Sequence, residues 1–396
     1  MNNHVLPTIF SHIYRTNFIK LPMPEHNWNE LAQSIADGEA ILVLGPDAIP
    51  FYPAQGSGEA QTFSQRTRQR INQLLDGQIS HFYERDNLFQ FTGRGAKQKA
   101  REQVRDCARD PNWLPDSELL RQIIAMPFPV VLSVNPDKCV FEAFIRYYRE
   151  PQFDYFTTKD KPNPVEIRYP DGLNQPLLYN LCGSVLDKMD SVVLDYYDLF
   201  ELLKKLLNNL GFPKALNQKL KDESTCRFIL LGFDLDRWDF QMFLHFINGL
   251  DGDNNPFSDN PNQSFPILSR VSKDSETFVM NQFNIQHVAT SRSDFDGLYT
   301  ACQAKGILRP LNDPGSPVET QIRMHVAQGK FEEAFQLLEK HLGTAEQQVD
   351  IPQLRGRYTD CLKQQKEGIA DSRDLLTEQN RIRYALLTYA SQIKTS

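Results

Sequence analysis

The sequence predicts an α/β protein with a doubly wound, mainly parallel sheet, followed by a small all-α bundle. Three observations carry this prediction. Four short apolar segments lack polar alternation, which is typical of parallel strands buried on both faces. Helix-forming stretches fill the gaps between these segments, as in alternating strand–helix folds. After residue 306 the pattern becomes purely helical.

The four apolar segments lie between residues 40 and 233, and each ends near glycine, asparagine or proline. They are "AILVLG" (40–45), "PVVLSVN" (129–135), "PLLYNLCG" (176–183) and "RFILLGF" (227–233). A fifth, weaker candidate is "FNIQHVA" (283–289), whose His287 is interpreted as a core histidine. Strands of this kind, with helices on both faces, predict a Rossmann-like sheet.

Helical periodicity appears on both sides of these strands. Trp28, Leu31, Ala32 and Ile35 share one face before Gly38, which suits a helix C-terminus. The stretch 61–122 is mostly helix-forming and charged, and we expect it to be a helical insertion that covers one side of the sheet.

Three regions follow from these patterns: an α/β domain over 1–306, a linker over 307–318 and a helical domain over 319–396. The linker is rich in proline and glycine. Two apolar stripes predict a bundle of about four helices beyond it. They consist of Phe331, Ala334, Phe335, Leu338 and Leu342, and of Leu375, Ile382, Leu386, Tyr389 and Ile393.

Composition narrows the classes of function. The 396 residues carry a formal net charge of −7, which argues against a general nucleic-acid or membrane-surface binder. The chain has no apolar run of about 20 residues and no leader-like start, so we expect a cytoplasmic protein. None of the six cysteines forms a C-x-x-C pair, which disfavours structural zinc and fits free thiols.

Two other local patterns are interpreted as surface. The basic stretch 93–105 follows aromatic residues, as at some nucleic-acid sites, but a solvated helix face suits the acidic chain better. The stretch "LDGDNNPFSDNPNQ" (250–263) resembles a calcium loop, but Pro256 and Asn262 stand where that loop needs glycine and glutamate.

Polar residues and glycines cluster where the four strands are expected to end. Ligands of open parallel sheets bind beyond the carboxyl ends of the strands. Buried strands do not need such residues for stability, so their coincidence predicts a binding site. The candidates are Gly45, Pro46 and Asp47, Asn135 and Asp137, Cys182 and Gly183, and Gly232 and Asp234.

The order of these strand ends resembles the sirtuin-like family, specifically a divergent bacterial branch found in antiphage defence proteins. "VLGPDAI" (43–49) takes the place of the family's glycine-rich turn, and "LSVNPD" (132–137) that of Thr-x-Asn-x-Asp. "NLCG" (180–183) takes the place of Leu-His-Gly, and "LLGFDLDRWD" (230–239) that of Gly-x-x-x-x-Asp. "VLDYYDLFELL" (193–203) also matches that branch.

The C-terminal region resembles an effector-associated domain, a helical adaptor of bacterial conflict systems. The resemblance rests on "GKFEEAFQLLEKHL" (329–342), "LRGRYTDCLKQQKEG" (354–368) and "EQNRIRYALLTYASQI" (378–393). It implies recruitment of other effector-associated-domain proteins through 319–396, and we also expect a homo-oligomer.

The sirtuin resemblance implies an NAD site and, in an active protein, hydrolysis of the nicotinamide–ribose bond. The glycine turn and the helix after it would hold the pyrophosphate, with Asn135 orienting the ribose and the attacking water. Cys182 stands where the family has its histidine base. A thiol with an ordinary pKa of about 8.5 is mostly protonated at neutral pH and a poor base. Pro46 lacks an N–H for a phosphate, and Asp47 adds negative charge.

Two functions therefore remain open: an NAD-binding, NAD-hydrolysing effector, and a catalytically inactive scaffold or nucleotide sensor. A protein deacylase fits poorly, because that family normally carries a zinc-binding cysteine module. Each of these site residues also has a purely structural interpretation. Asn135 could close a turn before Pro136, Cys182 could be a packed thiol, and Asp234 could be a loop residue or a ribose ligand.

Overall fold

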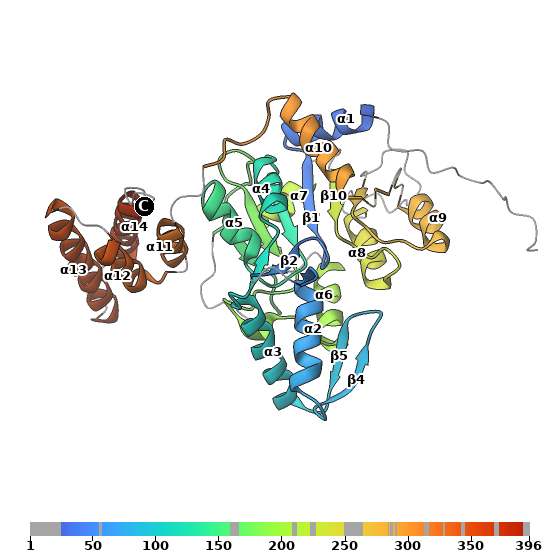
Figure 1. Cartoon of the computed structure of the whole chain (residues 1–396), viewed down its shortest axis with the longest axis horizontal. Coiled ribbons are helices and arrows are strands. Elements are labelled where there is room, and N and C mark those ends of the chain that lie inside the picture. The colour runs from blue at the N-terminus through green and yellow to red at the C-terminus, as the bar shows by residue number, and fades with distance from the viewer. Residues whose placement is uncertain are drawn as a thin grey trace, which may run out of the picture.

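A computed structural model gives the fold (Figure 1). It describes residues 25–54, 58–158, 166–207, 212–221, 227–248, 264–283, 285, 288–289, 291–312, 317–327, 329–341, 345–367 and 372–390. Its centre is a six-stranded sheet in which every neighbouring pair is parallel. In spatial order its strands are β11 (Ser264–Ile267), β10 (Arg227–Leu231), β1 (Ala40–Leu44), β7 (Val130–Ser133), β9 (Leu177–Asn180) and β8 (Gln152–Tyr155).

Both faces of the sheet are buried, which explains the unbroken apolar strands. Leu42 and Leu44 of β1 point into one core, while Ile41 and Val43 point into the other. Successive side chains of a strand face opposite sides, so covering both sides requires every residue to be apolar. Helices on the first face include α1 (Glu25–Ala36), α4 (Ser117–Ala125), α5 (Cys139–Tyr147) and α10 (Arg292–Ala304). Those on the second include α6 (Tyr196–Leu207), α7 (Lys214–Lys221), α8 (Trp238–Asn248) and α9 (Lys273–Gln282).

The Rossmann-like fold class predicted from the sequence is confirmed, and the four central strands lie where expected. The outer strands β8 and β11 were not predicted. β8 is short and mixed in character, and β11 contains Pro266, which normally argues against a strand. Of the weak fifth candidate, Ala289 forms an isolated bridge with Ile267. His287 and the calcium-like stretch 250–263 lie outside the described residues.

The insertion at 61–122 is helical only in part. It contains α2 (Phe63–Leu74), α3 (Arg94–Ala108) and α4, but also the antiparallel hairpin of β4 (Ile79–Tyr83) and β5 (Leu88–Phe91). The remaining strands β2 (Pro50–Pro53), β3 (Gln61–Thr62) and β6 (Trp113–Pro115) form a small separate sheet.

Only part of the insertion covers the sheet as predicted, because α4 lies on the first face and the rest does not. The lobe made by α2, α3 and the hairpin projects beyond the strand ends of the main sheet, instead of covering a face (Figure 1). Residues from α2, β5 and α3 line one cavity together with the residues that follow β7 and β9. The lobe therefore covers the edge of the sheet at which the strands end and a ligand is expected.

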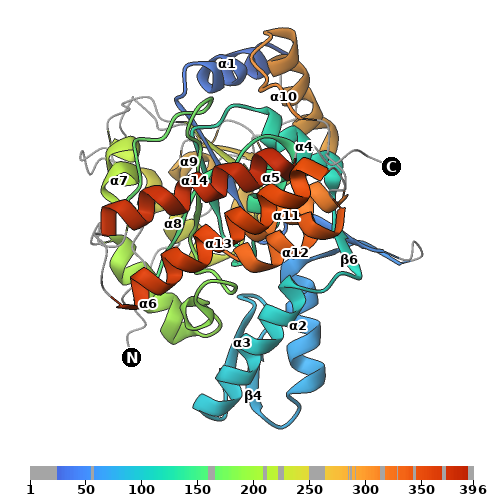
Figure 2. The same ribbon diagram turned by 90° about the vertical axis from the view of Figure 1, so that its left-hand side faces the viewer.

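The C-terminal region is helical, as predicted. It comprises α11 (Pro317–Ala327), α12 (Phe331–His341), α13 (Ala345–Glu367) and α14 (Ser372–Ala390). The described members of both predicted stripes lie in or against one core, whereas Leu342 and Ile393 lie outside the described residues. The bundle packs beside the α/β domain, with α11 against α5 (Figure 2) and an ion pair between Arg383 and Glu150.

The first half of the expected linker is part of the α/β domain. Arg309 is 2% exposed and donates hydrogen bonds to the carbonyl oxygens of Gly172, Ile124 and Phe128. Asn312 is held by the carbonyls of Tyr147 and Tyr148. Proline and glycine content marked the segment as a linker, but it could not reveal that a buried guanidinium anchors it.

Candidate functional site

The parallel sheet brings four strand ends to one edge. Gly45 follows β1, Gly232 follows β10, Asn135 lies two residues after β7 and Cys182 two residues after β9. β1 is the neighbour of both β10 and β7, so the turn after β1 lies at the centre of this edge. The topology thus gathers the predicted strand-end residues in the region where open α/β sheets bind ligands.

The turn after β1 uses its own N–H groups. Gly45 N donates to Leu231 O at 2.8 Å, and Asp47 N donates to Gly232 O at 3.1 Å. Ala48 N donates to Gly45 O at 3.2 Å, and Pro46 has no N–H. A phosphate placed here would find no free donor within the turn. The chain then enters β2 instead of a helix, so the helix N-terminus implied by the resemblance is absent at this point.

Close packing accounts for two of the glycines. A Cβ on Gly45 would lie 2.3 Å from Gly232 O, and a Cβ on Gly232 would lie 2.2 Å from Ala48 N. Gly232 also has a φ of +73°, which L residues rarely adopt. Both glycines thus allow the turn after β1 to pass against the end of β10. Their predicted role in cofactor binding stays a prediction.

Asp47 is neutralised from within the protein. One carboxylate oxygen accepts a hydrogen bond from Thr62 Oγ1 at 3.2 Å, and the other pairs with Arg270 at 3.0 Å. Arg270 was not found from the sequence, because it lies 223 residues along the chain and belongs to no motif. Because Arg270 offsets the negative charge of Asp47, this ion pair reduces the repulsion of an anionic ligand. The same pair also engages the cation that such a ligand would otherwise bind.

Asn135 and Cys182 lie together in a small cavity beneath the insertion lobe. Its volume is about 120 Å³, and Pro46, Arg237 and Asp239 also line it. Asn135 is 8% exposed, and its side-chain amide donates to Pro46 O at 3.3 Å. Ligand pockets for small molecules usually enclose about 300–1,000 Å³, so this cavity is too small for a dinucleotide in the conformation described.

The Cys182 thiol is poorly suited to acid–base chemistry. Burial, together with the negative charge of Asp239, raises its pKa to about 12, and Arg237 opposes these effects only in part. Arg237 is a cation near the thiol, but it is already engaged. It donates to both oxygens of Asp239, at 3.1 and 2.7 Å, and to the carbonyl oxygen of Asp86 at 2.9 Å. The thiol therefore keeps its proton at neutral pH.

Sequence reasoning missed Arg237 and Asp86. Arg237 lies within "GFDLDRWD" (232–239), where the aspartates drew attention and the arginine did not. Asp86 lies in the β4–β5 turn, is 8% exposed, and accepts a hydrogen bond from the Tyr196 hydroxyl. Its Oδ1 is buried without a partner among the described residues. Only the fold brings this turn to the strand ends.

Asp137 does not share the cavity of Asn135 and Cys182. Its Oδ1 accepts a hydrogen bond from Cys139 N at 2.9 Å, at the start of α5. The carboxyl group lines a different and larger cavity of about 970 Å³, which lies next to the C-terminal domain. The two residues that the motif places two positions apart therefore face separate spaces.

The remaining predicted residues have local structural roles. Asp234 Oδ1 accepts a hydrogen bond from Asp236 N at 3.1 Å and does not line the cavity of Asn135 and Cys182. Gly183 has a φ of +92°, and a Cβ there would lie 2.4 Å from Ser191 O. Among the described residues no cluster of three or more His, Cys, Asp or Glu side chains could hold a metal ion.

Fold and site thus define a Rossmann-like α/β domain with a polar strand-end edge, joined to a helical module. Comparison with family models identifies both parts. Residues 129–288 match the SIR2-like domain and residues 320–394 match effector-associated domain 11. The architecture recognised from the sequence is therefore confirmed, and this pair of domains suggests a conflict-system effector. No curated protein matches the chain.

Proposed function

We propose that this chain is a SIR2-like conflict-system component that acts by assembling with other proteins and does not hydrolyse NAD. The observation that carries the proposal is the Cys182 thiol. It takes the place of the family's histidine, and burial raises its pKa to about 12. A general base needs a pKa near the working pH, so this position cannot accept the ribose proton at neutral pH.

Two further features support the loss of hydrolysis. The N–H groups of the turn after β1 are bonded to the protein's own carbonyls, which leaves a pyrophosphate without its usual donors. The cavity that holds Asn135 and Cys182 measures about 120 Å³, below the size of ordinary ligand pockets.

Assembly is assigned to the C-terminal domain. We propose that 319–396 recruits other effector-associated-domain proteins, including further copies of this chain, in the cytoplasm. Support comes from the match over 320–394 and from an unusually exposed aromatic residue, Tyr384, which is 76% exposed on α14. Exposed aromatic side chains are enriched at protein interfaces.

A role in nucleic-acid binding is not favoured. Within the basic stretch, Lys97 pairs with Asp195 at 2.6 Å and with Asp198 at 2.8 Å. Arg101 lies 3.6 Å from Asp198 as well. These cations are directed at α6 and its start, and are not left for phosphates.

NAD hydrolysis after a conformational opening is the second candidate. The observation in its favour is that Asn135 and Cys182 line one cavity, as a water-orienting group and a proton acceptor would need to. If assembly lifted the insertion lobe away from the strand ends, this cavity would widen and NAD could enter. NAD would then be the substrate, or the ligand of a sensor.

NAD consumption by the full-length protein tests the proposal. The protein is concentrated until light scattering detects assemblies, and wild type is compared with Asn135→Ala and Cys182→His. The proposal predicts no turnover in wild type, whether or not Cys182→His gains activity. Turnover in wild type that Asn135→Ala abolishes, and that Asn112→Ala on an exposed turn retains, establishes the NADase instead.

A further inference from the structure

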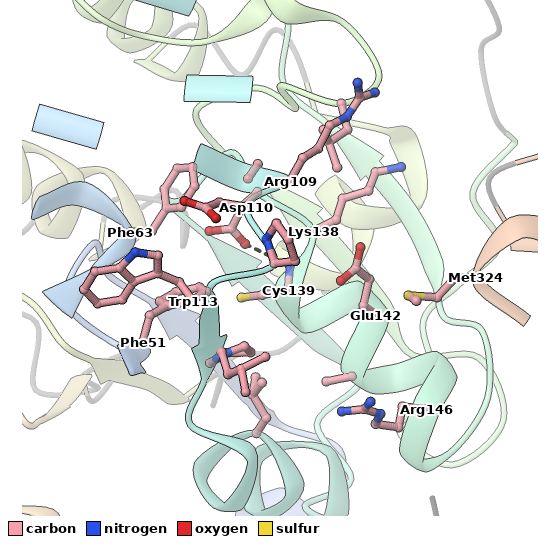
Figure 3. A pocket seen from close by; sticks show the side chains of 18 of the residues that line it. Phe51, Phe63, Arg109, Asp110, Trp113, Lys138, Cys139, Glu142, Arg146 and Met324 are labelled. Carbon is pink, nitrogen blue, oxygen red and sulfur yellow. Dashed lines mark hydrogen bonds between the residues drawn. The ribbon is translucent and has the colours of Figure 1, made fainter. Parts of the chain in front are cut away.

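A second cavity adjoins both domains and is distinct from the one that holds Asn135 and Cys182. Its volume is about 970 Å³. Phe51, Phe63 and Trp113 form an aromatic wall, and Glu142 and Met324 lie on the opposite side (Figure 3). Met324 belongs to α11, so the cavity is completed by the C-terminal domain. A volume of this size suits a small organic molecule.

Asp137 places an unsatisfied carboxyl group in this cavity. The residue is 8% exposed, and its Oδ2 is buried without a hydrogen-bond partner among the described residues. Burial raises the pKa of this carboxyl. A buried polar atom without a partner is unfavourable, so a ligand that donates a hydrogen bond to Oδ2 would be stabilised here.

Glu142 adds a second carboxyl group to the same wall. Burial, together with the negative charge of Asp137, raises its pKa to about 7. Among the described residues neither Glu142 nor Asp137 makes an ion pair. Lys138 and Arg146 act on Glu142, and Arg66 acts on Asp137, but only in part, because burial keeps the pKa of both carboxyl groups raised.

The buried cations of the cavity are engaged elsewhere. Lys138 Nζ pairs with Asp187 at 2.7 Å and lies over the ring of Phe153. Arg66 donates to Cys107 O at 3.2 Å and lies over the rings of Phe51 and Trp113. Neither cation forms an ion pair with the carboxyl groups of Asp137 and Glu142.

The rim of the cavity has the opposite charge. Arg109, Arg146 and Lys330 are exposed cations along its edge. They disfavour a polycation and attract an anionic group. Among the described residues, no group of three or more His, Cys, Asp or Glu side chains could hold a metal ion here.

We propose that this cavity binds a small organic molecule with one ammonium or guanidinium group and a neutral or anionic remainder. The cationic group pairs with Asp137 and Glu142, the apolar stem lies against the aromatic wall, and an anionic end faces the rim. The ligand is either a free amino-acid derivative or the side chain of a basic residue in a peptide.

The position of the cavity gives the ligand a second effect. Met324 and His325 of α11 line it together with residues of α5. His325 Nδ1 is buried without a partner among the described residues. An occupant that touches both domains favours the arrangement in which α11 lies against α5, because a ligand stabilises the state it binds.

Isothermal titration calorimetry on the full-length protein at pH 8 tests the site. The probes are N-α-acetyl-L-arginine and N-α-acetyl-L-lysine, with N-acetylglycine and spermidine for comparison. We expect at least one of the first two to bind, N-acetylglycine to give no signal, and spermidine to bind more weakly. The blocked tripeptide Gly-Arg-Gly, with acetylated and amidated ends, distinguishes a peptide side chain from a free amino-acid derivative. The proposal is overturned if N-α-acetyl-L-arginine, N-α-acetyl-L-lysine and the tripeptide all fail to bind. It is also overturned if spermidine binds more tightly than these three.

Two near-isosteric variants locate the binding. Glu142→Gln and Asp137→Asn should each weaken the affinity at least about tenfold, the effect of about 1.4 kcal/mol. Glu118→Gln, the same change at an exposed position at the start of α4, should leave it unchanged. Arg146→Gln on the rim should weaken the binding of N-α-acetyl-L-arginine but not the binding of its amide. This variant keeps both buried carboxyl groups. Equal affinity in wild type, Glu142→Gln and Asp137→Asn overturns the proposal.

Discussion

The side-chain amide of Asn135 donates a hydrogen bond of 3.3 Å to the carbonyl oxygen of Pro46. This contact joins the segment after β7 to the turn after β1, across two neighbouring strands of the sheet. The amide that would orient a ribose in an active relative is thus bound to the protein's own backbone. In the described conformation the strand-end edge is closed by its own polar groups.

The first prediction concerns this contact. Asn135→Ala should lower the free energy of unfolding by about 1 kcal/mol, the usual contribution of one hydrogen bond. Urea denaturation measures the change. Asn112→Ala, which removes an exposed side-chain hydrogen bond to Asp110, is the comparison and should lose less. An unchanged free energy in Asn135→Ala would mean that the contact does not stabilise the closed edge.

Gly232 gives a second prediction, in which backbone conformation and steric clash can be separated. Gly77 and Gly232 share a φ of +73°, but an added Cβ at Gly77 meets no atom within 4 Å. Gly77→Ala should therefore be less stable by about 1–2 kcal/mol from conformation alone. Gly232→Ala should lose a further amount of about 1–3 kcal/mol, because its Cβ would overlap the backbone of Ala48. Equal losses in the two variants, measured by thermal unfolding, would contradict the close packing.

Arg309 carries the third prediction. Burial lowers its pKa to about 10, so the guanidinium stays charged at pH 7. Arg309→Ala would leave three buried carbonyl oxygens without this donor, and we expect a loss of at least about 3 kcal/mol. The exposed Arg146→Ala should lose less than about 0.5 kcal/mol. A similar small loss at both positions, by urea denaturation, would contradict the anchoring role of Arg309.

The fourth prediction is a pH dependence due to Glu142. Its pKa in the folded protein, about 7, lies above the ordinary value of 4.5, mainly because of burial. Folding therefore favours the protonated carboxyl. This contribution to stability is fully present below pH 4.5 and is lost as the pH rises through 7. Asp137 strengthens the effect, while Lys138 and Arg146 oppose it.

Urea denaturation at pH 5 and pH 8 checks this sign. The stability of wild type relative to Glu142→Gln should fall between the two values by up to about 3 kcal/mol. Groups that both proteins share cancel in this difference. Glu118→Gln should follow wild type at both pH values. A difference between wild type and Glu142→Gln that rises with pH would show that Glu142 is stabilised as a carboxylate.

The central fold could be predicted because burial on both faces leaves a simple signal. β1, β7, β9 and β10 are apolar at nearly every position, since each residue enters one core or the other. The outer strands carry no such signal, because β8 is short and mixed in character and β11 contains Pro266. The separate hairpin of β4 and β5 is polar in part. The hairpin is stabilised by contacts within the lobe, and these contacts leave no periodic pattern in the sequence.

The candidate site was predictable as a set of strand ends but not as a geometry. Asn135 and Asp137 lie in a turn, where residues two positions apart need not face the same side. Asn135 faces one cavity and Asp137 faces another. The partners that decide the chemistry, Arg237 beside Cys182 and Arg270 beside Asp47, come from distant or unremarked positions. Only the folded chain brings them there.

The anchoring of Arg309 and Asn312 has a consequence for any larger assembly. Five peptide steps separate Asn312, held by the α/β domain, from Pro317 at the start of α11. Their covalent reach is at most about 18 Å. The helical domain is thus joined to the α/β domain by a short connection. Copies that associate through their helical domains must therefore hold their α/β domains close to one another. At such spacing each domain meets the next at a local concentration in the millimolar range, so contacts too weak to form between free molecules become populated.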